Sequence, residues 1–129
     1  MSESEKRNLE VVKHWAETYN DDVDRMVTEC YAENCRVSSV FGGAVIEGRD
    51  RFLKLERRVV KVAPRRNIRL EHIHAAGDVV VVEAILLDPD QGDKWQSPFC
   101  AVLTFKDGKI VQDRTYLDDT RWPGFQRPQ

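Results

Sequence analysis

The stretch LTFKDGKIVQDRTYLD, Leu103–Asp118, combines a tight turn with a polar strand and decides which fold the rest of the chain must complete. Asp107 and Gly108 form a dipeptide that favours a two-residue hairpin turn, and β-branched and apolar residues flank it on both sides. We therefore predict two antiparallel strands joined at this turn. The second strand carries Asp113 and Thr115, which belong either to a catalytic site or to an ordinary sheet.

The sequence around this hairpin predicts a longer antiparallel sheet. The run NIRLEHIHA is followed by a turn at Ala76-Gly77-Asp78 and by the β-branched run VVVVEAILL, and the loop DPDQGDK leads from there into WQSPFCAVLTF. Upstream, the alternating segment CRVSSVF predicts a further strand, and a Gly-Gly turn separates it from the short segment AVIEG. The expected strands cover residues 35–41, 44–48, 67–75, 79–87, 95–105 and 110–118.

Three helices are expected before residue 63. Apolar residues recur at helical spacing from Glu5 to Tyr19, and Asp21 or Asp22 is placed to cap a short second helix by accepting its first amide hydrogens. A third helix should run from about Arg49 to Val62, because the residue before a proline is disfavoured in helical conformation. We predict an α+β domain in which these helices cover one face of the sheet.

Composition limits the domain count and the partners. The chain has 129 residues, of which 41% are hydrophobic, so we expect a single domain over residues 1–129, with a core at about 8–118 and a tail over the surface at 119–129. A net charge of -2 disfavours nucleic acid and anionic membranes. The charged N-terminus and the lack of a long apolar run predict a cytoplasmic protein.

The sequence contains no recognisable metal-binding or cofactor-binding motif. Cys30, Cys35 and Cys100 show no paired spacing and no nearby histidines, so we interpret them as reduced, packed thiols. No glycine-rich phosphate loop, nucleophile elbow or H-E-x-x-H motif is present. We expect no metal and no cofactor, which leaves acid–base chemistry or ligand binding.

The order of these elements resembles that of the nuclear transport factor 2-like (NTF2-like) superfamily, in particular its SnoaL-like branch. The resemblance is carried by VVKHWAETYNDDVDRMVTECYAENC, IEGRDRF and the hairpin LTFKDGKIVQDRTYLD, and it covers about Asn8 to Asp118. It implies a cone-shaped fold, with three N-terminal helices packed on a curved antiparallel sheet, an apolar pocket between them, and a homodimer. The superfamily includes isomerases, cyclases, epoxide hydrolases, dehydratases and proteins without known activity, so the fold alone assigns no function.

For two of the activities in this superfamily, the catalytic residues are missing from this sequence. Its steroid isomerases use an aspartate base with a tyrosine and a neutral aspartic acid as oxyanion donors. The matching positions are Trp15, Ser39 and Ala101, none of which can take these roles. The Asp-Arg-Asp set of the limonene epoxide hydrolases would fall on Leu86, Ala84 and Thr115. Neither chemistry is therefore expected.

The polyketide cyclases offer a closer match, because they place an acidic residue in the last strand. That position corresponds to Thr115, and Asp113 lies two residues earlier on the same face of the strand. We choose Asp113 as the catalytic candidate, acting in an apolar pocket that raises its pKa. The alternative is that Asp113 hydrogen-bonds a neighbouring strand or lies in water.

The remaining candidates are residues expected to line the pocket or to donate hydrogen bonds. Tyr19 or Trp15 could donate to a developing oxyanion, whereas aromatic residues at these spacings are more often simply core. Whether His72 and His74 face the pocket depends on the strand register. The pocket candidates are Trp15, Tyr19, Met26, Ser39, Phe41, Phe52, Phe99, Ala101 and Thr115.

Two functions remain open at this point. The first is a cofactor-independent isomerase, cyclase or dehydratase that acts on a polyketide, steroid or terpenoid-like molecule through Asp113. The second is a non-catalytic dimeric module that binds an apolar small molecule or serves a structural purpose. The sequence does not decide whether the protein is an enzyme.

Overall fold

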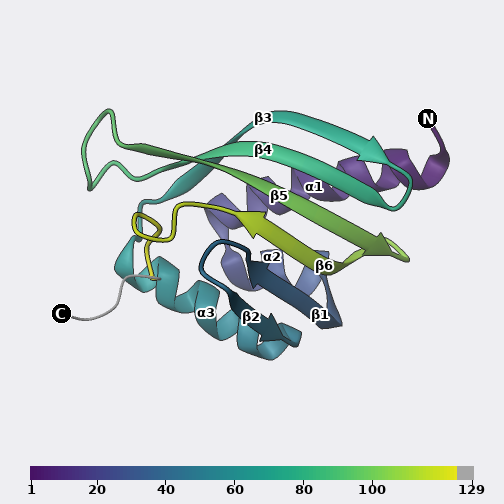
Figure 1. Ribbon diagram of the computed structural model, residues 1–129, viewed down its shortest axis with the longest axis horizontal. Helices are drawn as coiled ribbons and strands as arrows, with labels where there is room; N and C mark the ends of the chain where they lie inside the picture. The colour runs from purple at the N-terminus through teal and green to yellow at the C-terminus, as the bar shows by residue number, and fades with distance from the viewer. Residues whose placement is uncertain (125–129) are drawn as a thin grey trace.

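The computed structural model describes residues 1–124 as three helices and a six-stranded sheet (Figure 1). The helices come early in the chain, and the last four strands follow one another, as the sequence predicts. The helices are α1 (Glu3–Asp21), α2 (Val23–Cys30) and α3 (Arg49–Val62). The strands are β1 (Tyr31–Ser39), β2 (Ala44–Glu47), β3 (Asn67–Ala76), β4 (Val79–Leu87), β5 (Gln96–Lys106) and β6 (Lys109–Tyr116).

The sheet has the order β2-β1-β6-β5-β4-β3 and is mixed rather than wholly antiparallel. The strands from β3 to β6 pair antiparallel, as predicted, but β1 pairs parallel to β6. Hydrophobic alternation does not report strand direction, so the sequence pattern could not reveal this pair. Strand β1 also starts earlier than expected, because the extended residue Tyr31 that ends α2 continues directly into the strand.

Local side-chain bonds fix the helix ends. Ser2 and Glu5 form a reciprocal capping box at the start of α1, and the Asp22 carboxylate accepts the Asp24 and Arg25 amide hydrogens at the start of α2. At the other end of α1, the Asn20 side chain exchanges two hydrogen bonds with the Ile68 backbone, at 2.7 and 3.0 Å. Asn20 therefore fastens α1 to the edge strand β3.

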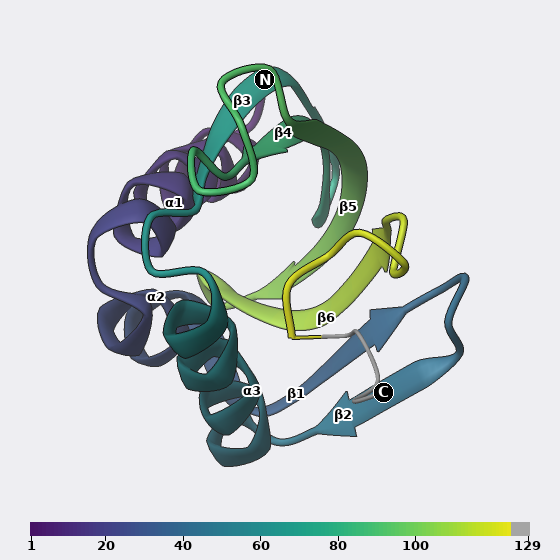
Figure 2. The same cartoon turned by 90° about the vertical axis from the view of Figure 1, so that its left-hand side faces the viewer.

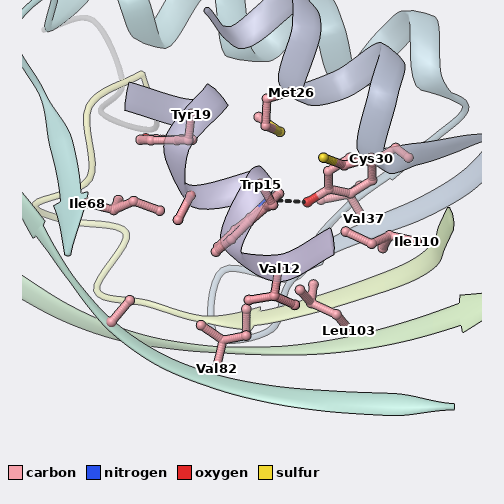
Figure 3. Packing of buried hydrophobic residues seen from close by; sticks show 14 of the residues in the cluster. Val12, Trp15, Tyr19, Met26, Cys30, Val37, Ile68, Val82, Leu103 and Ile110 are labelled. Carbon is pink, nitrogen blue, oxygen red and sulfur yellow. Dashed lines mark hydrogen bonds between the residues drawn. The ribbon is translucent and has the colours of Figure 1, made fainter. Parts of the chain in front are cut away.

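The curved sheet and the helices enclose the core between them. Figure 2 shows the sheet wrapping around one side of the interior, with α1, α2 and α3 along the other. In the close view of Figure 3, Val82 and Leu103 from the sheet face Val12 of α1, with Trp15 beyond it. Val12, Val82 and Leu103 are fully buried, so this end of the cone is closed by aliphatic packing.

A bulge in β6 sets which of its side chains point inward. Thr104 pairs with Gln112, whereas the next residue, Phe105, pairs with Ile110, so Val111 is the extra residue. Strict alternation from the buried Ile110 would direct Gln112 inward. The bulge shifts the alternation by one residue, and Asp113 is buried instead.

The segment after β6 differs from the expected surface tail. Leu117 and Trp122 are buried, at 5% and 7% exposure, and Trp122 packs edge-on against Phe99 with ring centroids 5.0 Å apart. Burying these two large apolar side chains favours a segment that folds back over the interior. The last part of the expected tail, residues 125–129, lies outside the described residues.

Candidate functional site

A cavity of about 60 Å³ lies between the helices and the concave face of the sheet. All three helices and five of the six strands contribute to its wall, and Trp122 of the C-terminal segment also lines it. Apolar and aromatic side chains dominate the lining, which contains no Lys, Arg or His among the described residues. The polar side chains of the wall are those of Tyr19, Tyr31, Ser38, Ser39, Glu56, Asp113 and Thr115.

Asp113 lies at this cavity on β6, with both carboxylate oxygens held by hydroxyl groups. The Thr115 hydroxyl donates to Oδ1 at 2.5 Å, and the Tyr31 hydroxyl donates to Oδ2 at 2.6 Å. Trp15 Nε1 in turn donates to the Tyr31 oxygen at 3.1 Å, the bond drawn as a dashed line in Figure 3. Burial raises the pKa of Asp113, and the two hydroxyl donors oppose that rise by stabilising its charged form.

Glu56 is a second carboxyl group at the same cavity, and the sequence analysis missed it. It lies on α3, is 9% exposed, and its Oε2 has no hydrogen-bond partner among the described residues. Burial raises the pKa of Glu56 to about 7, with the Asp113 charge adding to the rise and Arg66 opposing it. A signal was present, because Glu56 is four residues after Phe52 and three before Val59, within the buried stripe of the helix.

Two further polar atoms at the cavity wall lack a partner within the described part of the chain. They are the Tyr19 hydroxyl and the Ser39 hydroxyl, both on buried side chains. Burial raises the pKa of Tyr19, so its phenol stays protonated and can donate a hydrogen bond. Buried polar groups are nearly always satisfied, so these atoms and Glu56 Oε2 mark a place where a polar ligand or water fits.

Arg66 supplies a fixed positive charge beside the cavity. Its guanidinium lies 4.6 Å from the centre of the Tyr19 ring, and Nη2 donates to the Tyr19 backbone oxygen at 2.9 Å. Arg66 is itself buried. It therefore holds Tyr19 in place and partly offsets the charge of an ionised Glu56.

Most of the sequence-predicted pocket residues line the cavity. They are Trp15, Tyr19, Met26, Ser39, Phe52, Phe99, Asp113 and Thr115. Phe41 does not: it lies beyond the end of β1 in the turn to β2, is 75% exposed, and stacks edge-on against Tyr116. Ala101 is fully buried in the core outside the cavity wall, between its register partners Val82 and Thr115. The expectation that Phe41 and Ala101 line the pocket was therefore wrong.

The histidines are separate from the cavity. His72 and His74 on β3 are exposed, and His14 on α1 bonds Glu29 at 2.7 Å on the surface. Over residues 1–124, no three His, Cys, Asp or Glu side chains are grouped so that they could hold a metal ion. Within the same range, no helix is both long and apolar enough to cross a membrane.

The fold and the cavity define a class: an NTF2-like α+β cone with ionisable groups inside a largely apolar interior. The sequence profile of the SnoaL-like domain matches residues 12–113, and the chain belongs to this family. A comparison with curated proteins found no match.

Solved structures with the same fold extend over nearly the whole chain. One is a candidate SnoaL-like polyketide cyclase from Jannaschia sp. CCS1, with a TM-score of 0.79, 21% identity, and coverage of 92% of this chain and 90% of that one. Another is a protein of ketosteroid isomerase-like fold from Catenulispora acidiphila in complex with trimethylamine, with a TM-score of 0.77, 19% identity, and coverage of 92% and 98%. A third is a candidate ketosteroid isomerase from Kribbella flavida, with a TM-score of 0.75, 14% identity, and coverage of 96% and 84%. At these identities the likeness shows the fold.

Proposed function

We propose that the protein is a cofactor-independent acid–base enzyme that moves a proton on a small carbonyl compound, with Asp113 as the base. The observation that carries the proposal is the position of Asp113: a buried carboxyl group at an apolar cavity, with both oxygens oriented by hydroxyl donors. A carboxylate in such surroundings is more basic than one in water and has no water shell to lose.

The neighbours of Asp113 support a role in proton transfer rather than a purely structural one. Each carboxylate oxygen accepts one protein hydrogen bond, which leaves further lone pairs to receive a substrate proton. The Tyr31 hydroxyl is itself held by Trp15, so the carboxylate has little freedom to rotate. This is the preorganisation that general-base catalysis needs.

Cavity size limits the substrate. One water needs about 10–15 Å³, so a cavity of about 60 Å³ has room for a small organic molecule. A small cyclic or branched ketone fits this space. A polyketide or steroid, as the sequence analysis expected, is larger than this space.

The test is turnover of a panel of cyclic ketones and small polyketides across pH, on the wild-type protein and on Asp113→Asn. We expect Asp113→Asn to lose at least about a hundredfold in rate, the usual contribution of a positioned base, while ligand affinity is retained. Asp93→Asn removes an exposed carboxylate from the loop before β5 and is the matched control. Equal turnover by Asp113→Asn and the wild type would rule out Asp113 as the base.

A second candidate function is a binding module for a small organic cation. Aromatic faces and two carboxyl groups line the cavity, and this combination attracts ammonium groups. Among the described residues no Lys, Arg or His lines the cavity, and Arg66 lies behind Tyr19 as a nearby positive charge. The neighbour of the same fold that holds trimethylamine favours this alternative.

Calorimetry with two ligands of equal shape separates the candidates. Choline carries a positive charge, and the neutral alcohol in which carbon replaces its nitrogen does not. Tighter binding of choline, without turnover of any ketone in the panel, would favour the binding module. Equal or weaker binding of choline would exclude recognition of the charge.

We also retain the homodimer and the cytoplasmic location as proposals. Phe41 and Tyr116 form an exposed aromatic pair, and Val81 and Ile85 are partly exposed on the outer face of the sheet. These apolar side chains support a dimer in which a second copy of the chain covers this face. Light scattering at micromolar concentration should give twice the monomer mass. A monomeric mass would contradict the proposed dimer.

A further inference from the structure

Glu56 reaches the cavity from a different layer of the fold than Asp113. Asp113 comes from β6 in the sheet, whereas Glu56 comes from α3 in the helical layer, and both side chains line the same space. A small molecule in the cavity would therefore lie between two carboxyl groups that belong to different layers of the fold. An arrangement of this kind can remove a proton at one position of a ligand and supply one at another.

The surroundings of the two groups favour opposite protonation states. Asp113 accepts hydrogen bonds from Tyr31 and Thr115, and hydroxyl donors stabilise a carboxylate. Glu56 is buried, and its Oε2 has no donor within the described chain. Without such donors the neutral acid is the favoured form in an apolar site.

The ionisable groups of the described chain that interact with Glu56 include one that opposes its protonation, Arg66. They come from four other parts of the chain: Tyr19 of α1, Tyr31 of β1, Asp113 of β6, and Arg66 between α3 and β3. Asp113 and burial favour protonation of Glu56, and Arg66 alone among the four opposes it. After Glu56 has given its proton away, Arg66 is in place to stabilise the carboxylate that remains.

We propose that Glu56 is a catalytic acid that works with Asp113 as a pair, and that the substrate class is a small ketone or enone converted through its enol. This inference rests on the proposed function, because it needs Asp113 as the base. It names the second residue and the reaction class.

The step balances with these two groups alone. The Asp113 carboxylate takes a proton from the carbon next to the carbonyl, and the electrons of that C–H bond form a carbon–carbon double bond. The π electrons of the carbonyl take the proton of Glu56, so the products are an enol, a neutral Asp113 and an ionised Glu56. Neutral Asp113 then gives its proton to another carbon of the conjugated system, while ionised Glu56 takes back the enol proton as the carbonyl re-forms, which gives the isomer and restores both groups. The Tyr19 hydroxyl is unpartnered in the described chain, and the Glu56 charge acts on it electrostatically. In this step it donates a hydrogen bond to the carbonyl oxygen of the substrate.

Hydrogen exchange of cyclopentanone in deuterium oxide, followed by proton NMR, measures the first half of this reaction. We expect the wild type to exchange the protons next to the carbonyl, with a rate that falls as pH rises above the Glu56 pKa of about 7. Glu56→Gln should lose at least about tenfold in rate and also lose this alkaline fall, because its amide can donate a hydrogen bond but no proton. Glu47→Gln, which removes an exposed carboxylate from β2, is the matched control.

The outcomes separate this inference from the proposed function. Loss of exchange in Asp113→Asn with an unchanged rate and pH profile in Glu56→Gln would overturn the role of Glu56 and leave Asp113 as the base. Exchange by the wild type no faster than by Asp113→Asn would overturn both.

A readout that needs no activity completes the test. In NMR of carboxyl-labelled protein, Glu56 should titrate near 7, and at a lower pH in Asp113→Asn, because the Asp113 charge raises the Glu56 pKa. Titration of Glu56 near the ordinary value of 4.5, or at the same pH in both proteins, would contradict the proposal that Glu56 and Asp113 act as a pair at one cavity.

Discussion

Asp113 and Glu56 are both buried carboxyl groups, yet the fold surrounds them differently. Hydroxyl donors hold both oxygens of Asp113, whereas Glu56 has a buried oxygen without a partner in the described chain. An unpartnered buried group of this kind lowers stability unless a ligand satisfies it. We interpret Glu56 as a residue that serves ligand binding and lowers the stability of the ligand-free protein.

Replacing Glu56 should change how stability depends on pH. The pKa of Glu56 rises from 4.5 to about 7 in the folded protein, so the folded state binds more protons than the unfolded state between these values. The contribution of Glu56 to stability is therefore lost as pH rises through this window. Relative to the wild type, Glu56→Gln should gain up to about 3 kcal/mol of unfolding free energy between about pH 5 and about pH 8.

Urea unfolding of both proteins at these two pH values measures the difference. Glu47→Gln should show the same pH dependence as the wild type, because Glu47 is exposed. A Glu56→Gln variant that gains nothing at the higher pH would show that Glu56 is not buried as an acid.

At the level of single residues, the sequence predicted Asp113 better than Glu56. The inward direction of Asp113 followed from the family resemblance at Thr115, which placed the two residues on one face. Glu56 was overlooked because a charged residue on a helix is normally assigned to water, although Phe52 and Val59 placed it within the buried stripe. Only the packed structure shows that this stripe borders a cavity.

At the level of elements, Asn20 joins the end of α1 to the edge of the sheet. Its amide accepts from the Ile68 nitrogen and donates to the Ile68 oxygen, as a neighbouring strand would. The contact covers part of the open edge of β3 and fixes the helix that carries Trp15 and Tyr19 into the cavity.

Asn20→Ala should therefore loosen the edge of β3. Two hydrogen bonds are lost, and we expect the free energy of unfolding to fall by about 1–3 kcal/mol. Amide hydrogen exchange at Ile68 should become faster in the same variant. Asn67→Ala on the same strand removes only a bond of 3.5 Å to Arg65 and should have a much smaller effect. Unchanged amide exchange at Ile68 in Asn20→Ala would contradict the conclusion that Asn20 holds the edge of β3.

The spans of helices and strands could be predicted, because they follow from hydrophobic periodicity. The features that depend on strand register and pairing could not. The capped helices and the four consecutive strands matched the expected spans closely. The bulge at Val111 and the parallel pairing of β1 with β6 have no counterpart in hydrophobic alternation. Phe41 was misplaced for a related reason, since alternation was continued past Ser39, where β1 ends.

At the scale of the whole molecule, the segment after β6 completes the cavity. Trp122 contacts Phe99 and lines the cavity, so the core extends past the last strand. A segment of this composition, rich in Pro and Arg, was expected at the surface, and only packing against the open end of the cone shows otherwise.

Trp122→Ala should open the cavity to water. Removing the ring should lower the free energy of unfolding by about 3–5 kcal/mol and reduce the burial that raises the Asp113 pKa. NMR titration should therefore find Asp113 closer to its ordinary value than in the wild type. Trp122→Phe keeps an aromatic cover and should shift the titration less. An Asp113 pKa that is the same in Trp122→Ala as in the wild type would show that Trp122 does not control solvent access.

The central claim is that the cone holds Asp113 as a desolvated carboxyl group at a cavity, and its titration tests this most directly. In NMR of carboxyl-labelled protein, Asp113 should titrate above the ordinary value of 3.8, because burial disfavours its charged form more than the two hydroxyl donors favour it. The same residue in an unfolded peptide of residues 110–118 provides the reference. A folded-state value equal to or below that of the peptide would contradict the account.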